Sequence, residues 1–156
     1  MIAPPVDWLR RATRADQAEI EAVQHAAYAD TAKTIGRTPI PLTWDYAEVI
    51  ANWDVFVADD EHGICGVLIL HVRSDDLYLE SIAVDPRQRG TGLGNRLLAV
   101  TDETARCNGR NVVRLLTNGL NVDRIALYER RGYRIEHTEI LDDRRIVHMV
   151  KDLSVS

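Results

Sequence analysis

The sequence has few cysteines and no long apolar run. Its two cysteines, Cys65 and Cys107, have the spacing of neither a disulfide framework nor a zinc site, so we expect two reduced, structural thiols. The longest apolar run, Ile64 to Leu70, is far too short to cross a bilayer. The first residues, MIAPPVDWLRR, lack the apolar segment of a signal peptide. We therefore expect a cytoplasmic location and no membrane partner.

The sequence also lacks the patterns that bind metals and the charge balance that binds polyanions. Its five histidines form no H-x-x-H or H-E-x-x-H pair, so we expect no metal. With 24 acidic and 19 basic side chains the formal charge is −5, which argues against a nucleic-acid partner. A content of 46% hydrophobic and 28% charged residues is typical of a globular protein, and the length favours one domain over residues 1–156.

A basic, glycine-rich turn between a strand and a helix is the most informative stretch that is present. Leu77 to Val84 predicts a strand, an Asp-Pro pair ends it, and RQRGTGLG (87–94) leads into an amphipathic helix. Glycines permit positive φ angles and close approach of backbone N–H groups to a ligand, at the positive end of the helix dipole. The segment therefore predicts an anion-binding turn, with its two arginines as additional donors.

The glycine spacing narrows the choice of anion. A P-loop for ATP or GTP ends in Gly-Lys-Ser/Thr, whereas Gly94 is followed by Asn95 and Arg96. A dinucleotide site needs G-x-G-x-x-G and an acid at the end of the next strand. Here the glycines run G-x-G-x-G, and the next strand ends at Thr117 and Asn118 without an acid. The sequence therefore disfavours a nucleoside triphosphate site and a dinucleotide-binding oxidoreductase.

Hydrophobic periodicity and turn residues predict the other elements. Before the turn we expect a strand at Trp8–Thr13, a helix that Asp16 caps and that ends at about Tyr28, and an irregular connection at Thr31–Pro41. A helix at Trp44–Asn52, capped by Thr43, and strands at Val55–Ala58 and Ile64–Val72 follow. After it we expect a helix ending at Asn108-Gly109, a strand at Val112–Leu116, a helix at Val122–Arg131, and a hairpin of Tyr133–Ile140 and Ile146–Leu153. This order predicts a mixed α/β fold, with a mostly antiparallel central sheet and helices on both faces.

Two motifs resemble one family. The order Arg87-x-x-Gly90-x-Gly92, after a strand reading ESIAV, resembles the acetyl-CoA pyrophosphate loop of the GNAT superfamily of N-acetyltransferases. NVDRIALYERRGY (121–133) resembles its second signature, an asparagine seven residues before a tyrosine and a helix stop at Gly-Tyr. The element order is also that of the GNAT fold, and the weakest match is Ala26–Leu42, which shapes the substrate side in that family.

The resemblance implies acetyl-CoA as cosubstrate. The implied contacts come from the end of the central strand, the glycine turn and the second signature: Ile82, Ala83, Val84, Arg87, Gln88, Arg89, Gly90, Thr91, Gly92, Leu93, Gly94, Asn121 and Tyr128. For Asn121 and Tyr128 the alternative is a helix cap and a core tyrosine.

Two side chains are candidates for proton transfer. Alternation puts Tyr78, Glu80, Ile82 and Val84 on one strand face, with Glu80 as the only carboxylate of the strand. The resemblance implies a carboxylate that takes a proton from an amine and a tyrosine that protonates the departing thiolate, which we assign to Glu80 and Tyr128. A solvated or ion-paired glutamate is the alternative for Glu80, and His71 is a second candidate base.

The acceptor is the least constrained part. The resemblance places Tyr28 and Trp44 on the substrate side together with Glu80, although single aromatics are more often core residues. Asn118 precedes a glycine in an expected turn, and Arg144-Arg145 is expected at a solvated hairpin tip. Without an extended basic or aromatic surface, a small-molecule primary amine is the expected acceptor. A protein N-terminus or lysine, a non-catalytic acyl-CoA-binding module, and a homodimer remain open.

Overall fold

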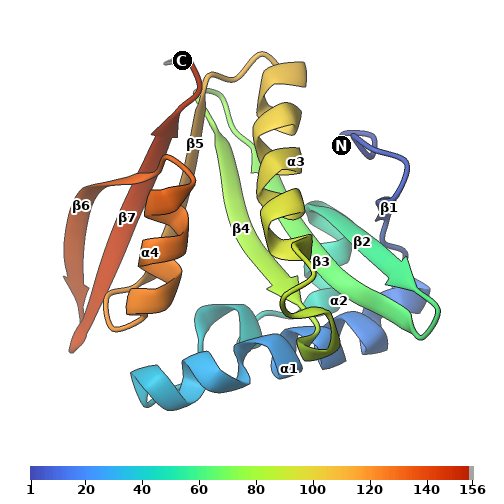
Figure 1. Ribbon diagram of the computed structural model, residues 1–156, viewed down its shortest axis with the longest axis horizontal. Helices are drawn as coiled ribbons and strands as arrows, with labels where there is room; N and C mark the ends of the chain where they lie inside the picture. The colour runs from blue at the N-terminus through green and yellow to red at the C-terminus, as the bar shows by residue number, and fades with distance from the viewer. Residues whose placement is uncertain (155–156) are drawn as a thin grey trace.

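A seven-stranded sheet with helices on both faces forms the centre of the computed structural model, which describes residues 1–154 (Figure 1). The strand order is β1-β2-β3-β4-β5-β7-β6, and every neighbouring pair is antiparallel except β4 and β5. This confirms the predicted mixed α/β fold with a mostly antiparallel sheet.

The elements follow the predicted order. The strands are β1 (Arg10–Arg11), β2 (Asp54–Asp60), β3 (Gly63–Val72), β4 (Leu77–Val84), β5 (Val112–Asn118), β6 (Arg134–Leu141) and β7 (Arg144–Asp152). The helices are α1 (Gln17–Ile35), α2 (Tyr46–Asn52), α3 (Leu93–Cys107) and α4 (Val122–Arg130). Single 3₁₀ turns cover Arg14–Asp16, Ile40–Leu42 and Pro86–Gln88.

Alternating side chains along the strands divide the core into two layers. In β2, Val55 and Val57 are buried with the apolar residues of α1 and α2. Phe56 and Ala58 point to the opposite face and are buried with α3 and α4. Each helix pair therefore covers its own face of the sheet.

Three local predictions in the N-terminal part are wrong. β1 keeps only Arg10–Arg11 of the expected strand. The helix α1 continues past Tyr28 to Ile35, so the first part of the expected irregular connection is helical; Gly36, with a φ of 71°, ends it. The carboxylate of Asp45, rather than the Thr43 hydroxyl, caps α2 by accepting hydrogen bonds from two backbone N–H groups.

β4 contains a bulge at Glu80. Ser81 is opposite Ile69 and Leu79 is opposite Leu70, so Glu80 is an additional residue with no partner position of its own on β3. A bulge inserts one residue into the alternation and bends the strand.

The bulge corrects the predicted faces of β4. Ile82 and Val84 share the α3 and α4 layer with Leu79, whereas Ala83 is buried in the α1 and α2 layer. The expectation that Glu80, Ile82 and Val84 share one face is therefore wrong, because strict period-two alternation holds only for a strand without a bulge.

β4 and β5 separate soon after they meet. Their parallel pairing holds at Leu77 opposite Val113 and Tyr78 opposite Arg114 and then ends, while β5 stays paired with β7 from Val112 to Asn118. Figure 1 shows the two strands diverging from this joined end. The sheet is thus split into two halves, and a cleft lined by residues of both strands lies between them.

The joined end is held by a buried carboxylate. Asp76 is 2% exposed and accepts hydrogen bonds from Arg73 Nε and Nη2, both at 2.6 Å, and from Arg114 Nη1 of β5 at 2.9 Å. Arg73, and to a smaller degree Arg114, keep the pKa of Asp76 below its ordinary value. Asp76 therefore ties the turn before β4 to β5.

Replacement of this carboxylate should destabilise the fold. We expect Asp76→Ala to lower the free energy of unfolding by about 2–4 kcal/mol at neutral pH, because two arginines lose their partner. Folding lowers the pKa of Asp76, so this contribution is lost as the pH falls through the folded pKa. The stabilities of the native protein and the variant should therefore converge in acid. Urea unfolding at several pH values measures this. Asp75→Ala, at the exposed neighbour, should change stability by less than about 0.5 kcal/mol; equal effects of both variants would refute the account.

Candidate functional site

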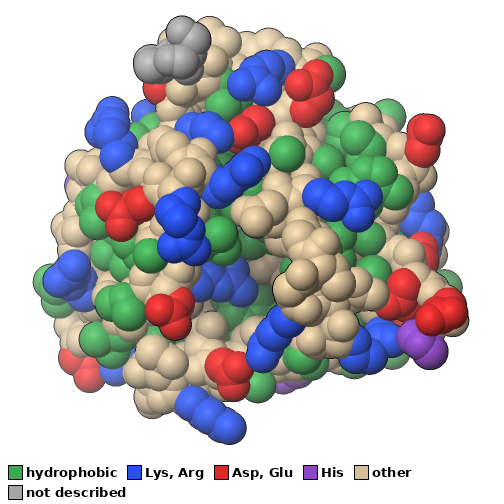
Figure 2. Space-filling model, in the orientation of Figure 1, with side chains coloured by type: hydrophobic (Ala, Val, Ile, Leu, Met, Phe, Trp, Pro, Cys, Tyr) green, Lys and Arg blue, Asp and Glu red, His purple; other side chains and the backbone are tan. Residues whose placement is uncertain are grey.

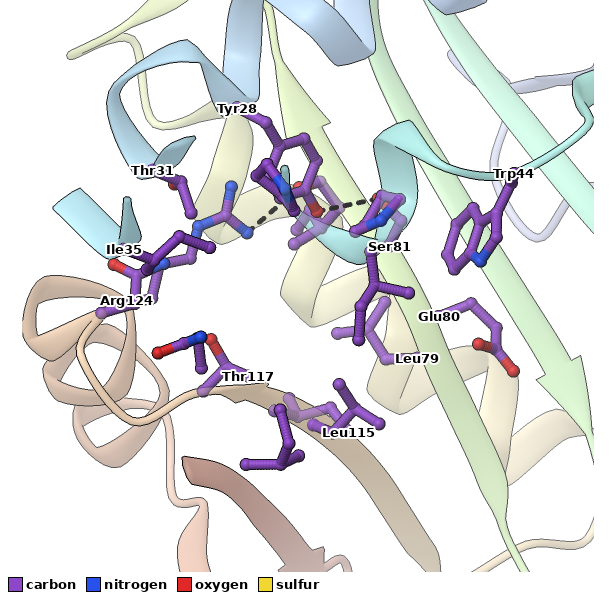
Figure 3. A pocket seen from close by; sticks show the side chains of 18 of the residues that line it. Tyr28, Thr31, Ile35, Trp44, Leu79, Glu80, Ser81, Leu115, Thr117 and Arg124 are labelled. Atoms are coloured by element: carbon purple, nitrogen blue, oxygen red, sulfur yellow. Dashed lines mark hydrogen bonds between the residues drawn. The ribbon is translucent and has the colours of Figure 1, made fainter. Parts of the chain in front are cut away.

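A cavity of about 190 Å³ lies where β4 and β5 separate (Figure 3). Its walls come from α1 and the turn after it, from β4 and β5, from α4, and from the start of β7. It brings together six residues predicted from the sequence, Tyr28, Trp44, Glu80, Ile82, Asn121 and Tyr128. In the orientation of Figure 1, the surface is hollowed near its centre and basic side chains stand beside the hollow (Figure 2).

Glu80 is mostly buried at one side of the cavity. Its side chain is 18% exposed, and the nearest ionisable partner in the described chain is His71, with Nδ1 4.0 Å from Glu80 Oε1. Burial raises the pKa of Glu80 to about 7, against a smaller opposing effect of Arg73. A carboxylate with this pKa is half deprotonated at neutral pH and can accept a proton. Figure 3 shows Glu80 beside Trp44, with Arg124 on the other side of the cavity.

Tyr128 lies in the same cavity and is held by Arg124. Arg124 Nη1 donates to the Tyr128 hydroxyl at 3.3 Å and to the Ile82 carbonyl at 3.2 Å, and its guanidinium stacks 4.8 Å from the centre of the Tyr28 ring. Burial raises the pKa of Tyr128 while Arg124 opposes this, so the phenol is protonated at neutral pH. Sequence reasoning missed Arg124, although it lies one helical turn before Tyr128.

The free edge of β4 faces the cleft. The N–H and C=O groups of one residue in an antiparallel strand point to the same side. Because the Ile82 carbonyl accepts from Arg124, the N–H of Ile82 also faces the cleft, as do the backbone groups of Val84 two residues on. Asp85 instead donates its N–H to Cys65 of β3. Ala83 is fully buried under α1, so its side chain is not available to a ligand.

The glycine turn has positive φ angles and backbone N–H groups without acceptors. Gly90 and Gly92 have φ angles of 79° and 85°, and Gly92 precedes the first residue of α3. Among residues 1–154, the N–H groups of Gly92, Leu93 and Gly94 meet no hydrogen-bond acceptor. The Thr91 hydroxyl donates to the Gln88 carbonyl at 2.6 Å and stiffens the turn. The turn lies beyond the C-terminal end of β4, outside the cavity itself.

The two arginines of the turn form ion pairs at its rim. Arg87 Nε lies 3.1 Å from Asp85 Oδ1, and Arg89 Nη1 lies 3.2 Å from Asp30 Oδ2 of α1. The Gln88 amide donates to Asp60 at 2.8 Å. Exposed pairs of this kind are weak, so both guanidinium groups can turn toward a bound anion.

The predicted substrate-side aromatics are both core and cavity residues. The Tyr28 hydroxyl is 2.9 Å from Ser81 Oγ, and Gln24 Nε2 donates to Ser81 Oγ at 3.1 Å and to the Tyr46 hydroxyl at 2.6 Å. This buried network links Ser81, the residue after the bulge, to α1. Trp44 packs edge-on against Trp53, with ring centres 5.1 Å apart.

The two asparagines have different surroundings. Asn121 is 8% exposed at the N-cap position of α4, yet its side chain makes no capping hydrogen bond, so the helix-cap alternative is wrong in this respect. The Asn118 side chain accepts from the Leu120 N–H at 2.9 Å, which is the expected turn, and it also lines the cavity.

Neither a metal cluster nor a membrane span is found in the part of the chain that the structure describes. No group of three or more His, Cys, Asp or Glu side chains in residues 1–154 could hold a metal ion. No helix among these residues has the length and apolarity needed to cross a bilayer. Both cysteines are free thiols, Cys65 buried and Cys107 exposed.

Similarity to known proteins agrees with this geometry. The acetyltransferase Atu2258 of Agrobacterium fabrum (strain C58) is 29% identical over 80 residues, which cover 51% of this chain and 57% of the relative. The chain thus matches little more than half the length of this curated relative.

Two solved structures share the fold. The ribosomal-protein-S18-alanine N-acetyltransferase of Escherichia coli is 21% identical with a TM-score of 0.74, over 95% of this chain and 94% of that one. A putative streptothricin acetyltransferase of Bacillus anthracis, solved with acetyl coenzyme A, is 24% identical with a TM-score of 0.64, over 74% of this chain and 72% of that one.

A family match covers the centre of the chain. Residues 51–135 match the acetyltransferase (GNAT) domain, from the end of α2 through the bulged strand, the glycine turn and α4 into β6. The resemblance based on the two motifs is confirmed. The chain belongs to the GNAT family of acetyltransferases.

Proposed function

We propose that this protein transfers the acetyl group of acetyl-CoA to the primary amine of a small molecule, by direct attack of the neutral amine on the thioester. One observation carries the proposal. Glu80, which can accept a proton near pH 7, and Tyr128, which can donate one, line the same cavity beside the free edge of β4. Both groups together argue against a module that only binds acyl-CoA.

The chain has the groups to hold acetyl-CoA. The N–H groups at Gly92 and its two successors, with the positive end of α3, suit the pyrophosphate. Arg87 and Arg89 add charge at the rim, and the cleft-facing backbone at Ile82 and Val84 can pair with amide groups of the pantetheine arm. The cosubstrate supplies the activated acetyl group, and these contacts position it.

Glu80 and Tyr128 divide the proton transfers. Glu80 would take a proton from the amine, directly or through water, and Tyr128 would protonate the departing sulfur. The N–H of Ile82 can donate to the thioester oxygen as its charge develops. Arg124 contacts both the Tyr128 hydroxyl and the Ile82 carbonyl, so it must shift when the pantetheine arm pairs with β4.

The enclosure of the cavity supports a small acceptor. The turn after α1 covers it from one side through Thr38 and Pro39, and β7 closes it through Arg144 and Ile146. Arg37 Nη2 also lies 2.7 Å from Asp143 Oδ1, which joins this turn to the β6–β7 hairpin. A volume of about 190 Å³ fits an amine of modest size.

The glycine turn is tested by Gly92→Val. A valine would disfavour the φ of 85° and distort the N–H cluster, so acetyl-CoA should no longer raise the unfolding temperature. With acetyl-CoA at about 100 times its dissociation constant, the free energy of unfolding of the native protein should rise by about 2.7 kcal/mol. Gly109→Val is the matched control, since Gly109 follows the other end of α3 with a φ of 70° and has equal space. An unchanged shift in Gly92→Val would remove the turn from acetyl-CoA binding.

The acid is tested by Tyr128→Phe. Loss of the proton donor should lower kcat by about 10²–10⁴-fold with little change in acetyl-CoA affinity. Tyr133→Phe is the control, because the Tyr133 ring is buried 5.7 Å from that of Tyr128 but does not line the cavity. Thiol release measures kcat, and the shift of the unfolding temperature with acetyl-CoA measures the affinity. Full activity of Tyr128→Phe would exclude it as the acid.

The base is tested by pH and by Glu80→Gln. The kcat/KM of the native protein should rise with pH through about 7, and Glu80→Gln should lose this rise together with most activity. Because the folded pKa is raised, the folded state loses stability relative to the unfolded state between pH 4.5 and 7. Above pH 7, Glu80→Gln should therefore be more stable by about 1–3 kcal/mol. His71→Asn should keep the profile; if it abolishes the rise instead, His71 is the base.

A further inference from the structure

Two arginines line the cavity without a carboxylate partner. Arg124 comes from α4 and Arg144 is the first residue of β7. In residues 1–154 neither guanidinium forms an ion pair, and Arg144 Nε is buried with no hydrogen-bond acceptor. Glu80 is the single acid among the residues that line the cavity in this part of the chain. Arg144 is half-buried, and a buried N–H without an acceptor is costly, which favours an anionic ligand beside this side chain.

The neighbouring cavity shows the opposite arrangement. It is lined by the turn before β4, by β4 and β5, and by residues of β6 and β7, and Glu80 is among the residues that it shares with the first cavity. Its two arginines are neutralised within the protein, Arg73 by Asp76 at 2.6 Å and Arg114 by Asp76 and Glu136, both at 2.9 Å. Of these two cavities, as the described residues line them, only the one that holds Tyr128 has arginines without a carboxylate partner.

The hairpin tip explains why Arg144 has no partner. Its neighbour Asp143 pairs with Arg37 instead, at 2.7 Å, and Arg145 is exposed and packs on Gly119. The expected solvated tip is thus correct for Arg145 and wrong for Arg144, which lines the cavity.

The two arginines have different tasks. Arg124 Nη1 donates to the Ile82 carbonyl and the Tyr128 hydroxyl, and its guanidinium stacks on Tyr28, so Arg124 already has acceptors in the cleft. Arg144 has no such contact, and a guanidinium can bind a carboxylate through two parallel hydrogen bonds.

We propose that the acceptor is a small primary amine that also bears a carboxylate, an amino-acid-like compound whose carboxylate binds Arg144. This rests on the proposed acetyl transfer. The amine nitrogen bonds to the acetyl carbon as the carbon–sulfur bond breaks; the nitrogen gives one proton to Glu80, and the sulfur receives one from Tyr128. Polycationic amines are disfavoured, because two arginines face one glutamate.

The test is thiol release from acetyl-CoA with matched acceptors. The panel holds the standard amino acids that have a primary amine, their primary amides, and spermidine, each compared at equal concentration of neutral amine. We expect the native protein to prefer an amino acid over its own amide by about tenfold or more in kcat/KM, and to use spermidine poorly. Arg144→Gln should lower this preference by about tenfold, and Arg144→Lys should restore part of it.

Arg145→Gln is the matched control, since it removes the same charge from the next residue, which is exposed, and should leave the preference unchanged. A native protein that uses amides or spermidine as well as amino acids would overturn the inference and leave acetyl transfer standing, as would equal preference ratios in the two glutamine variants. If no amine in the panel releases thiol although acetyl-CoA raises the unfolding temperature, the transfer reaction fails and the inference fails with it.

Discussion

The separation of β4 from β5 is the constraint on which the site depends. Two residue pairs join these strands, and beyond them the N–H and C=O groups on the edge of β4 have no strand partner. Backbone polar groups in a protein interior need hydrogen bonds, so this edge must be satisfied by a side chain, by water or by a ligand. Arg124 takes the Ile82 carbonyl, and pantetheine amides can take its place. The bulge at Glu80 starts where the pairing ends, which places a carboxylate at the inner end of the cleft.

The rest of the fold holds the two sides of the cleft in place. Asp76 and its two arginines fasten the joined end, and the buried network of Tyr28, Gln24 and Ser81 fastens α1 to the strand beside the bulge. The half formed by β5, β7 and β6 carries α4, and with it Tyr128. The two groups proposed for proton transfer thus sit on opposite halves of a divided sheet, so their spacing depends on packing that is distant in sequence.

Local chemistry could be predicted from the sequence, and pairing between distant segments could not. The glycine turn, the strand before it and the final hairpin of β6 and β7 depend on nearby residues, and the sequence predicted their positions correctly. The bulge at Glu80 is visible only in the register against β3, so the predicted faces of Ile82 and Val84 were wrong. The roles of Arg124 and Arg144 could not be predicted, because they depend on residues distant in sequence. Arg124 binds the Ile82 carbonyl of β4, and Arg144 has no carboxylate partner because Asp143 pairs with Arg37.

The central claim is that acetyl-CoA binds along the free edge of β4 and at the N-terminus of α3. A titration of the ¹⁵N-labelled protein with acetyl-CoA, followed through backbone amide resonances, tests it most directly. The account predicts shifts at Ile82, Val84 and Gly92, where N–H groups face the cleft or meet no acceptor, and none along the exposed edge strand β6. Saturable binding that moves β6 resonances and leaves those three amides unchanged would contradict it.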